Sequence, residues 1–192
     1  MVYALIACRV LLAVVFAVSA FGKLRSRRAF EEFTSAARQL APGWLIRPLQ
    51  GSGATTGAHR LAAVVVGCEV AIPPLLLAPR TAAVGFALAA ALLAAFTAAI
   101  VAVLRRGDRV ACHCFGATDQ ALRPAHVVRN LLLLTAAATG LVLALAAPSA
   151  QPALVGAVAA VGTAGILALP VLLFDDLLDL FTPTIPRRPT AP

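Results

Sequence analysis

The sequence predicts an all-α integral membrane protein: a helical bundle with about five transmembrane helices and one amphipathic surface helix. Two observations predict this fold class. Hydrophobic residues make up 61% of the 192 residues, which is more than a water-soluble domain of this size can bury. The chain also contains five apolar runs of about 18 residues or more, each long enough to cross a bilayer as a helix.

The predicted spans cover approximately residues 2–21, 61–78, 81–104, 127–147 and 153–174. Together they form a single transmembrane domain over residues 1–175. Residues 176–192 are a Pro-rich tail that we expect to be disordered. We expect Gly51–Gly57 to be a flexible linker and Ala78–Arg80 to be a tight turn.

Residues 27–40 predict an additional amphipathic helix, because Phe30, Phe33, Ala37 and Leu40 recur at helical spacing. Pro42–Gly43 ends it. This helix either lies on the membrane surface, with Trp44 as an interfacial anchor, or packs on the bundle as a connecting helix.

The formal net charge of +8 does not indicate nucleic-acid binding. The basic residues lie almost entirely in the connections between the spans, where Lys and Arg face solvent and lipid headgroups. The partner that the composition predicts is therefore the lipid bilayer.

Cys112-His113-Cys114 stands out in the polar connection between the third and fourth spans. It fits a redox pair, because Arg105, Arg106 and Arg109 would lower the pKa of a nearby thiol. It also fits a copper site made of Cys112, His113 and Cys114, since Cu(I) accepts few soft ligands. A structural disulfide and a chance pair of small loop residues remain alternatives.

Ionisable groups also occur within the apolar runs, where they are costly and therefore candidates for function. Glu69 lies in the second span and Arg9 in the first, while Arg129 and Asn130 open the fourth. We expect Glu69 to pair with Arg129 or Arg9, either to tune the thiol pair and relay its protons or to fix the helix register. Cys8 and Cys68 lie at different depths, so a disulfide between them is not expected; Cys68 is a candidate resolving thiol.

The motif Cys112-His113-Cys114-Phe115-Gly116, followed by Arg129-Asn130 at the head of a span, resembles the MauE family of redox-associated membrane proteins, within the wider DoxX-like group. Three other segments are also similar to the family. The family's first span resembles "RVLLAVVFAVSAFGKL" (residues 9–24), its short helix resembles "AFEEFTSAARQLAP" (residues 29–42), and its second span resembles "AAVVVGCEVAIPPLLL" (residues 62–77). The resemblance covers roughly residues 4–174.

The resemblance implies a four-helix core like that of DoxX-like proteins and epoxide reductases, and a thiol–disulfide role in protein maturation. Cys112 and Cys114 would exchange disulfides with a thioredoxin-like or secreted partner, supported by His113, Phe115, Gly116 and Arg109, and by Arg129, Asn130 and Glu69. No cofactor is required; a membrane quinone is a candidate electron acceptor, by fold analogy alone. The epoxide reductases' Cys-x-x-C motif and their second cysteine pair are absent.

The distribution of Lys and Arg and the family resemblance predict opposite orientations of the chain in the membrane. Most Lys and Arg residues, Lys23 among them, lie on the side of the Cys112–Cys114 connection, which places that side in the cytoplasm by the positive-inside rule. The resemblance implies a multi-pass plasma-membrane protein with this connection on the exoplasmic face, where disulfides form and persist. We take the exoplasmic face as the expectation.

Overall fold

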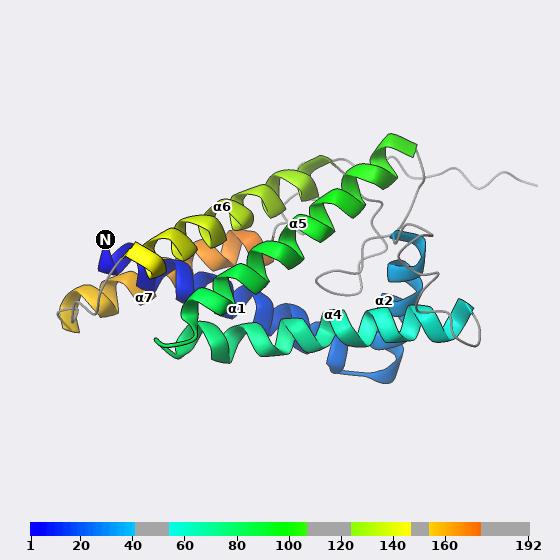
Figure 1. The fold of residues 1–192 in the computed structure, drawn as a ribbon, viewed down its shortest axis with the longest axis horizontal. Helices are drawn as coiled ribbons and strands as arrows, with labels where there is room; N and C mark the ends of the chain where they lie inside the picture. Colours follow the sequence, from blue (N-terminus) through cyan, green and yellow to red (C-terminus); the bar gives the residue numbers. More distant parts are fainter. Residues whose placement is uncertain (41–53, 107–123, 147–153, 174–192) are drawn as a thin grey trace, which may run out of the picture.

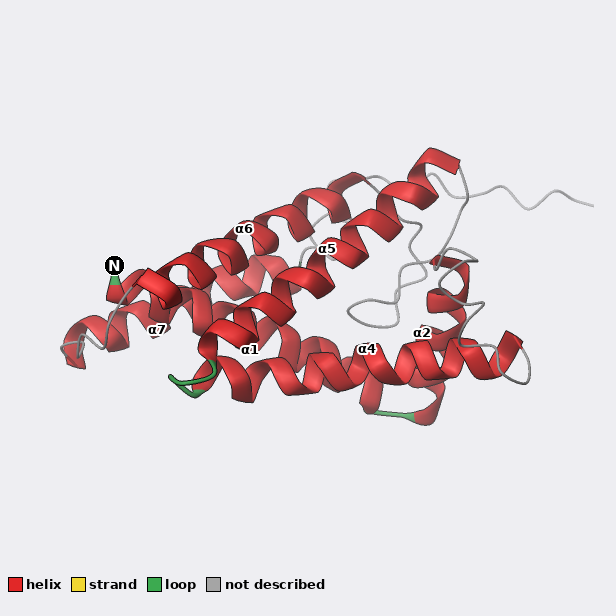
Figure 2. Ribbon diagram, in the orientation of Figure 1, coloured by secondary structure: helices red, strands yellow, loops and turns green. Residues whose placement is uncertain are grey.

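The computed structural model describes residues 1–40, 54–106, 124–146 and 154–173. In these ranges the chain forms helices joined by short turns, with no strand (Figures 1 and 2). The helices are α1 (Val2–Leu24), α2 (Arg27–Leu40), α4 (Ala54–Leu77), α5 (Ala82–Arg106), α6 (Pro124–Ala146) and α7 (Leu154–Leu172). The all-α prediction is confirmed.

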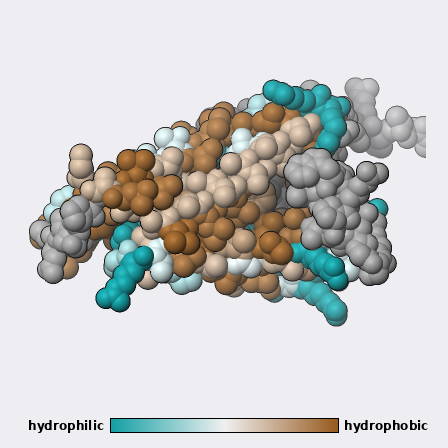
Figure 3. Space-filling view, viewed as in Figure 1, coloured by the Kyte–Doolittle hydropathy of each residue, from teal (hydrophilic) through white to brown (hydrophobic). Residues whose placement is uncertain are grey.

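Five of these helices are long and apolar enough to cross a membrane: α1, α5, α6, α7 and residues Thr56–Leu77 of α4. They correspond to the five predicted spans. The face in Figure 3 is apolar along the helices, and its strongly hydrophilic residues gather toward the two ends. This distribution suits a multi-pass protein whose middle faces lipid and whose ends face water.

The membrane helices α1, α4, α5 and α6 form a closed ring in which each helix packs against two neighbours (Figure 1). α7 packs on α1, outside the ring. Figure 1 shows that α1 and α5 run in one direction through the bundle and that α4 and α6 run in the opposite direction. α1 and α5 therefore end, and α4 and α6 begin, at the same end of the bundle. We call this the thiol end, because the segment with Cys112 and Cys114 joins α5 to α6 there.

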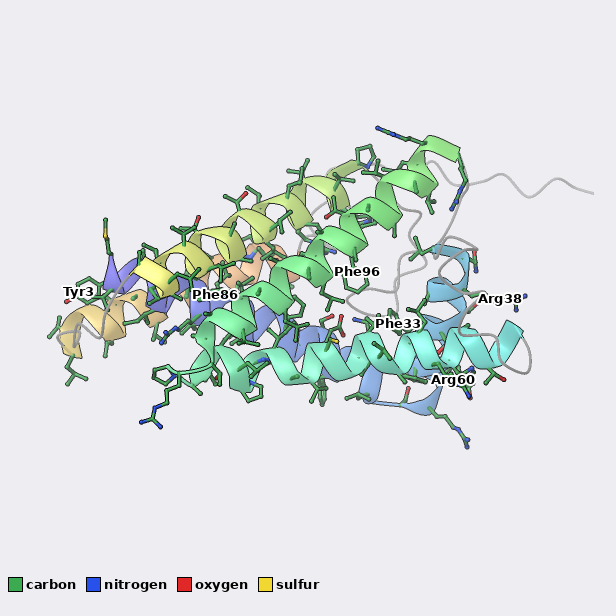
Figure 4. The ribbon with its side chains drawn as sticks, in the orientation of Figure 1. Tyr3, Phe33, Arg38, Arg60, Phe86 and Phe96 are labelled. Atoms are coloured by element: carbon green, nitrogen blue, oxygen red, sulfur yellow. The ribbon has the colours of Figure 1, made fainter. Side chains whose placement is uncertain are left out.

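The centre of the ring is apolar and tightly packed. Leu12 and Phe16 of α1 meet Ile72 and Leu76 of α4, Phe86 and Leu93 of α5, and Leu133 of α6. Gly140 of α6 lies against the Phe86 ring, at a position where a Cβ atom would overlap it. Figure 4 shows Phe86 between α5 and α6. Small residues let the helix backbones approach closely where lipid provides no hydrophobic force between them.

Helix α2 has the predicted bounds, residues 27–40, and packs on the bundle. Phe33 contacts Ala62 and Val66 of α4, and Leu40 contacts Ile100 and Val103 of α5. Figure 4 shows Phe33 between α2 and α4. The apolar face of α2 is therefore used for packing within the protein, as expected for a connecting helix, while Arg27 and Arg28 are exposed.

The beginning of α4 differs from the prediction. The helix starts at Ala54 rather than at Leu61, so residues 54–57 of the predicted flexible linker are helical. The physical reason is the packing of α2 on these first turns, where Ala58 and Ala62 are buried. Tertiary contacts thus extend the helix beyond its membrane-spanning part.

Candidate functional site

The intramembrane carboxylate of Glu69 forms a buried ion pair with Lys23. The Lys23 Nζ lies 2.8 Å from both Oε1 and Oε2 of Glu69. The two side chains are only 3% and 1% exposed. The sequence analysis expected Arg9 or Arg129 as the partner of Glu69, and this expectation is corrected: the partner in the ion pair is Lys23.

Ser19 completes what we call the buried polar cluster, made of Ser19, Lys23 and Glu69. The Lys23 ammonium donates to Ser19 Oγ at 2.7 Å, and the Ser19 hydroxyl donates to Glu69 Oε1 at 3.2 Å. Ser19 and Lys23 lie one helical turn apart, so α1 presents both on one face. The Lys23 Nζ also lies 4.8 Å from the centroid of the Phe33 ring, a cation–π contact from α2. The cluster therefore joins α1, α2 and α4.

The cluster lies near the thiol end of the bundle. Lys23 is the second-last residue of α1, and Glu69 is at its level in α4. Arg9 lies about 21 Å farther along α1, at about 1.5 Å per residue, and is half-buried. This distance explains why Arg9 does not reach Glu69.

The head of α6 contributes a second group of buried polar side chains. His126, Arg129 and Asn130 are 1%, 2% and 4% exposed, and all three face the interior of the bundle. They lie within the first two turns of α6, which begins at Pro124 where the thiol-containing segment ends. The structure therefore places the Arg-Asn half of the predicted motif inside the bundle at the thiol end.

One cavity connects the two polar groups. It is lined by Val15, Phe16, Ser19, Glu69, Leu93, Phe96 and Asn130, and has a volume of about 20 Å³. Its polar lining comes from α1, α4 and α6, and its apolar lining from α1 and α5. Glu69 and Asn130, which the sequence analysis named separately, thus meet at one site.

The structure describes two of the four cysteines, Cys8 and Cys68. Cys8 and Cys68 are partly buried free thiols, in agreement with the expectation that they form no disulfide. The other predicted site residues of the thiol motif lie outside the described residues: Arg109, Cys112, His113, Cys114, Phe115 and Gly116. The roles predicted for them, and for Cys68 as a resolving thiol, therefore stay predictions. In the described ranges, His, Cys, Asp and Glu side chains form no group of three that could hold a metal.

The family model of methylamine utilisation protein MauE matches residues 1–143 of the chain. The match covers well over half of the sequence. The chain belongs to the MauE family. Comparisons with curated proteins and with solved structures find no significant match. The resemblance proposed from the sequence is confirmed at the level of the family.

The residues that match the MauE family model are those that form the four-helix ring and α2. Residues 1–143 contain α1, α2, α4, α5 and nearly all of α6, which are the four-helix ring and the helix packed on it. The match also includes the buried polar cluster, the cavity and the motif from Cys112 to Asn130. Helix α7 lies beyond it. The part of the chain that matches the family is thus the part that builds the candidate site.

The sequence analysis missed Ser19, Lys23 and Phe33 as site residues. It counted Lys23 among the surface charges that set orientation, whereas the side chain is buried in an ion pair. A signal was present: Lys23 is the only lysine of the chain, and Leu12, Phe16, Ser19 and Lys23 follow one face of the first helix. A polar residue and a charge on the inward face indicate a buried polar site.

Proposed function

We propose that this MauE-family chain is a membrane thiol–disulfide redox protein that supports the maturation of another protein. Cys112 and Cys114 exchange disulfides with a thioredoxin-like or secreted partner. The observation that supports this proposal best is the burial of Arg129 and Asn130, the second half of the motif, in the head of α6, directly after the segment with the two cysteines. Rigid groups placed there can position the thiols.

In the proposed reaction, a thiolate of the partner attacks one sulfur of the Cys112–Cys114 disulfide. A mixed disulfide forms, and the other cysteine leaves as a thiolate. The partner's second thiol then attacks the mixed disulfide, which releases the oxidised partner and leaves Cys112 and Cys114 reduced. A two-electron acceptor, for which a membrane quinone is the candidate, takes two electrons and two protons to restore the disulfide.

The basic surroundings favour this chemistry. Arg109 and a protonated His113 stabilise the thiolate that leaves or attacks, because nearby positive charge lowers the pKa of a thiol. Phe115 and Gly116 shape the chain after the cysteines. Glu69, Arg129 and Asn130, which are buried in the bundle, are the supporting residues in this proposal.

A trapping experiment tests the exchange reaction. In Cys112→Ser or Cys114→Ser, one thiol remains and cannot be resolved by its neighbour, so a mixed disulfide with the partner accumulates. We expect a disulfide-linked complex in non-reducing gels from one single variant, and none from the double variant. If neither single variant forms a complex and copper co-purifies with the wild type, the chain is instead an assembly subunit with a Cys-His-Cys copper site.

We further propose that the chain lies in the plasma membrane with Cys112 and Cys114 on the exoplasmic face. What supports this proposal is the family resemblance, because disulfides form and persist on the exoplasmic side. A membrane-impermeant maleimide should label intact cells only after an impermeant reductant, and only when Cys112 or Cys114 is present. Labelling that requires opening the membrane would place the thiols in the cytoplasm and change the role to reduction or sensing.

A further inference from the structure

Arg9 lies on the inward face of α1, in the half of the bundle away from the thiol end. Leu5, Leu12 and Phe16 share this face at helical spacing and are buried. Arg9 itself is half-buried. Its Nε atom is buried and has no hydrogen-bond partner within the described ranges. The two terminal nitrogens of the guanidinium are not enclosed in this way, so they can reach the surface of the bundle.

The protein offers Arg9 no carboxylate in this half of the bundle. None of the ion pairs between described residues includes Arg9. Residues 1–18, 70–104 and 131–174 contain no Asp or Glu, and these ranges hold the parts of the membrane helices that lie away from the thiol end. A guanidinium stays charged at any physiological pH, and a half-buried charge without a partner is costly. An anion from outside the chain would balance it.

The position of Arg9 along α1 corresponds to the lipid headgroups. The membrane-spanning part of α4, Thr56–Leu77, has 22 residues and a length of about 33 Å, which matches a hydrocarbon core of about 30 Å. Its last residue therefore marks the boundary of the hydrocarbon at this end. Lys23 and Glu69 lie at one level. From that level, α4 continues for about 12 Å and Arg9 lies about 21 Å away. Arg9 is thus beyond the boundary, where phosphate groups are found.

The surroundings suit a phospholipid better than a free anion. Arg80, in the turn after α4, adds an exposed second cation at this end. Leu77 and Val84, on either side of the turn, are 63% and 59% exposed and can contact acyl chains. Tyr3, labelled in Figure 4 at the start of α1, is 41% exposed, as is typical of aromatic residues at a membrane interface.

We propose that Arg9 binds the phosphate group of one membrane phospholipid. Its two terminal nitrogens donate parallel hydrogen bonds to two phosphate oxygens, the geometry in which guanidinium groups recognise phosphate. Arg80 adds to the attraction, so an anionic lipid binds better than a zwitterionic one. The site uses no cysteine and lies away from the thiol end. The proposal therefore stands whether or not the proposed redox function holds.

Native mass spectrometry of the full-length protein in detergent, with added phosphatidylglycerol, tests the proposal. We expect the wild type to retain one lipid molecule more tightly than any further ones. Arg9→Gln should bind it about five times more weakly, the effect of one basic residue near a membrane surface. Arg60→Gln, which removes an exposed charge near the start of α4, is the matched control and should bind as the wild type does. Equal binding by the two variants would overturn the proposal, as would a wild type that retains no lipid.

Inorganic phosphate separates a lipid site from a site for a free anion. In large excess it should not displace the retained phosphatidylglycerol. Displacement that depends on Arg9 would assign the site to a soluble anion and contradict the lipid proposal. If Arg9→Gln does not fold, Arg9→Lys is used instead, because it keeps the charge but lacks the planar pair of donors. It should bind the lipid more weakly than the wild type, and unchanged binding would exclude the bidentate contact.

Discussion

At the residue scale, the ion pair between Lys23 and Glu69 is the main polar contact inside the bundle. Removing one partner of a buried pair leaves an uncompensated charge and costs about 3–5 kcal/mol, whereas replacing both by apolar residues is often neutral. We therefore expect Glu69→Leu and Lys23→Met each to lower the free energy of unfolding by about 3 kcal/mol or more. The double variant Lys23→Met/Glu69→Leu should recover most of this loss. Denaturant titration in mild detergent measures it.

The exposed pair of Arg28 with Glu32 on α2 provides a matched control. Its N–O distance is also 2.8 Å, but the two side chains are 89% and 30% exposed. An exposed pair at this helical spacing contributes roughly 0.3–0.5 kcal/mol, so Glu32→Leu should have little effect. If the losses of the two core single variants simply add in the double variant, Lys23 and Glu69 are not coupled.

A second prediction at the residue scale uses the fact that Lys23 is the only lysine. Its Nζ is held by Glu69, Ser19 and the Phe33 ring, and the side chain is 3% exposed. An amine-reactive ester should modify Lys23 in the folded protein far more slowly than the amine of Met1, which is 92% exposed. Mass spectrometry of the two sites measures the ratio. Denaturation should greatly raise the rate at Lys23 relative to the rate at Met1, and an unchanged ratio would be incompatible with the buried pair.

The sequence predicted Glu69, Arg129 and Asn130 as unusual residues but not the partner of Glu69. A charge in an apolar run is visible in the sequence because it is costly in a membrane. The pairing is not visible, since Lys23 and Glu69 are separated by the whole first connection and by α2. Helical spacing shows which residues share a face of one helix, but not which faces of two helices meet. Only the packed bundle showed that the face of α1 with Lys23 meets the face of α4 with Glu69.

At the scale of the elements, the contact of α5 with α6 depends on the absence of a side chain at Gly140. A Cβ atom there would overlap the Phe86 ring, which is fully buried. We expect Gly140→Ala to destabilise the bundle by about 1–3 kcal/mol, as for other overpacked cores. Adding Phe86→Leu should restore part of the loss, as measured by thermal unfolding in detergent.

Gly162 of α7 is the matched control for Gly140. A Cβ atom there would meet nothing within 4 Å. Because alanine is the better helix former, Gly162→Ala should leave stability unchanged or slightly raised. A similar loss in both variants would mean that close packing on Phe86 is not the cause.

The positions of the helices were predictable because each span is a long apolar run, and α2 was found by the spacing of Phe30, Phe33, Ala37 and Leu40. The ends were predicted less well. Helix α4 begins seven residues early, at Ala54, because α2 covers its first turns. Composition alone gave no indication of this, since "GSGATTG" has the residues of a flexible linker.

At the scale of the whole molecule, the ring of α1, α4, α5 and α6 closes without α7. The family match ends at residue 143, three residues before the end of α6. We therefore expect a chain of residues 1–146 to insert into membranes and to fold, with some loss of stability from the missing contacts of α7 on α1. Slow amine labelling of Lys23 in this shortened chain would show that the site is intact. Rapid labelling would mean that α7 holds the ring together.

The pairing of Lys23 with Glu69 also has a consequence for biosynthesis. An isolated charge at the centre of a span costs about 2.5–3.5 kcal/mol during insertion. At about 5–20 residues per second, Glu69 is synthesised a few seconds after Lys23. We therefore expect the first helix to stay beside the insertion site during this delay, so that the carboxylate enters the membrane next to its counter-ion. Replacement of Lys23 should then reduce the yield of correctly inserted protein, measured as the membrane-inserted fraction after synthesis.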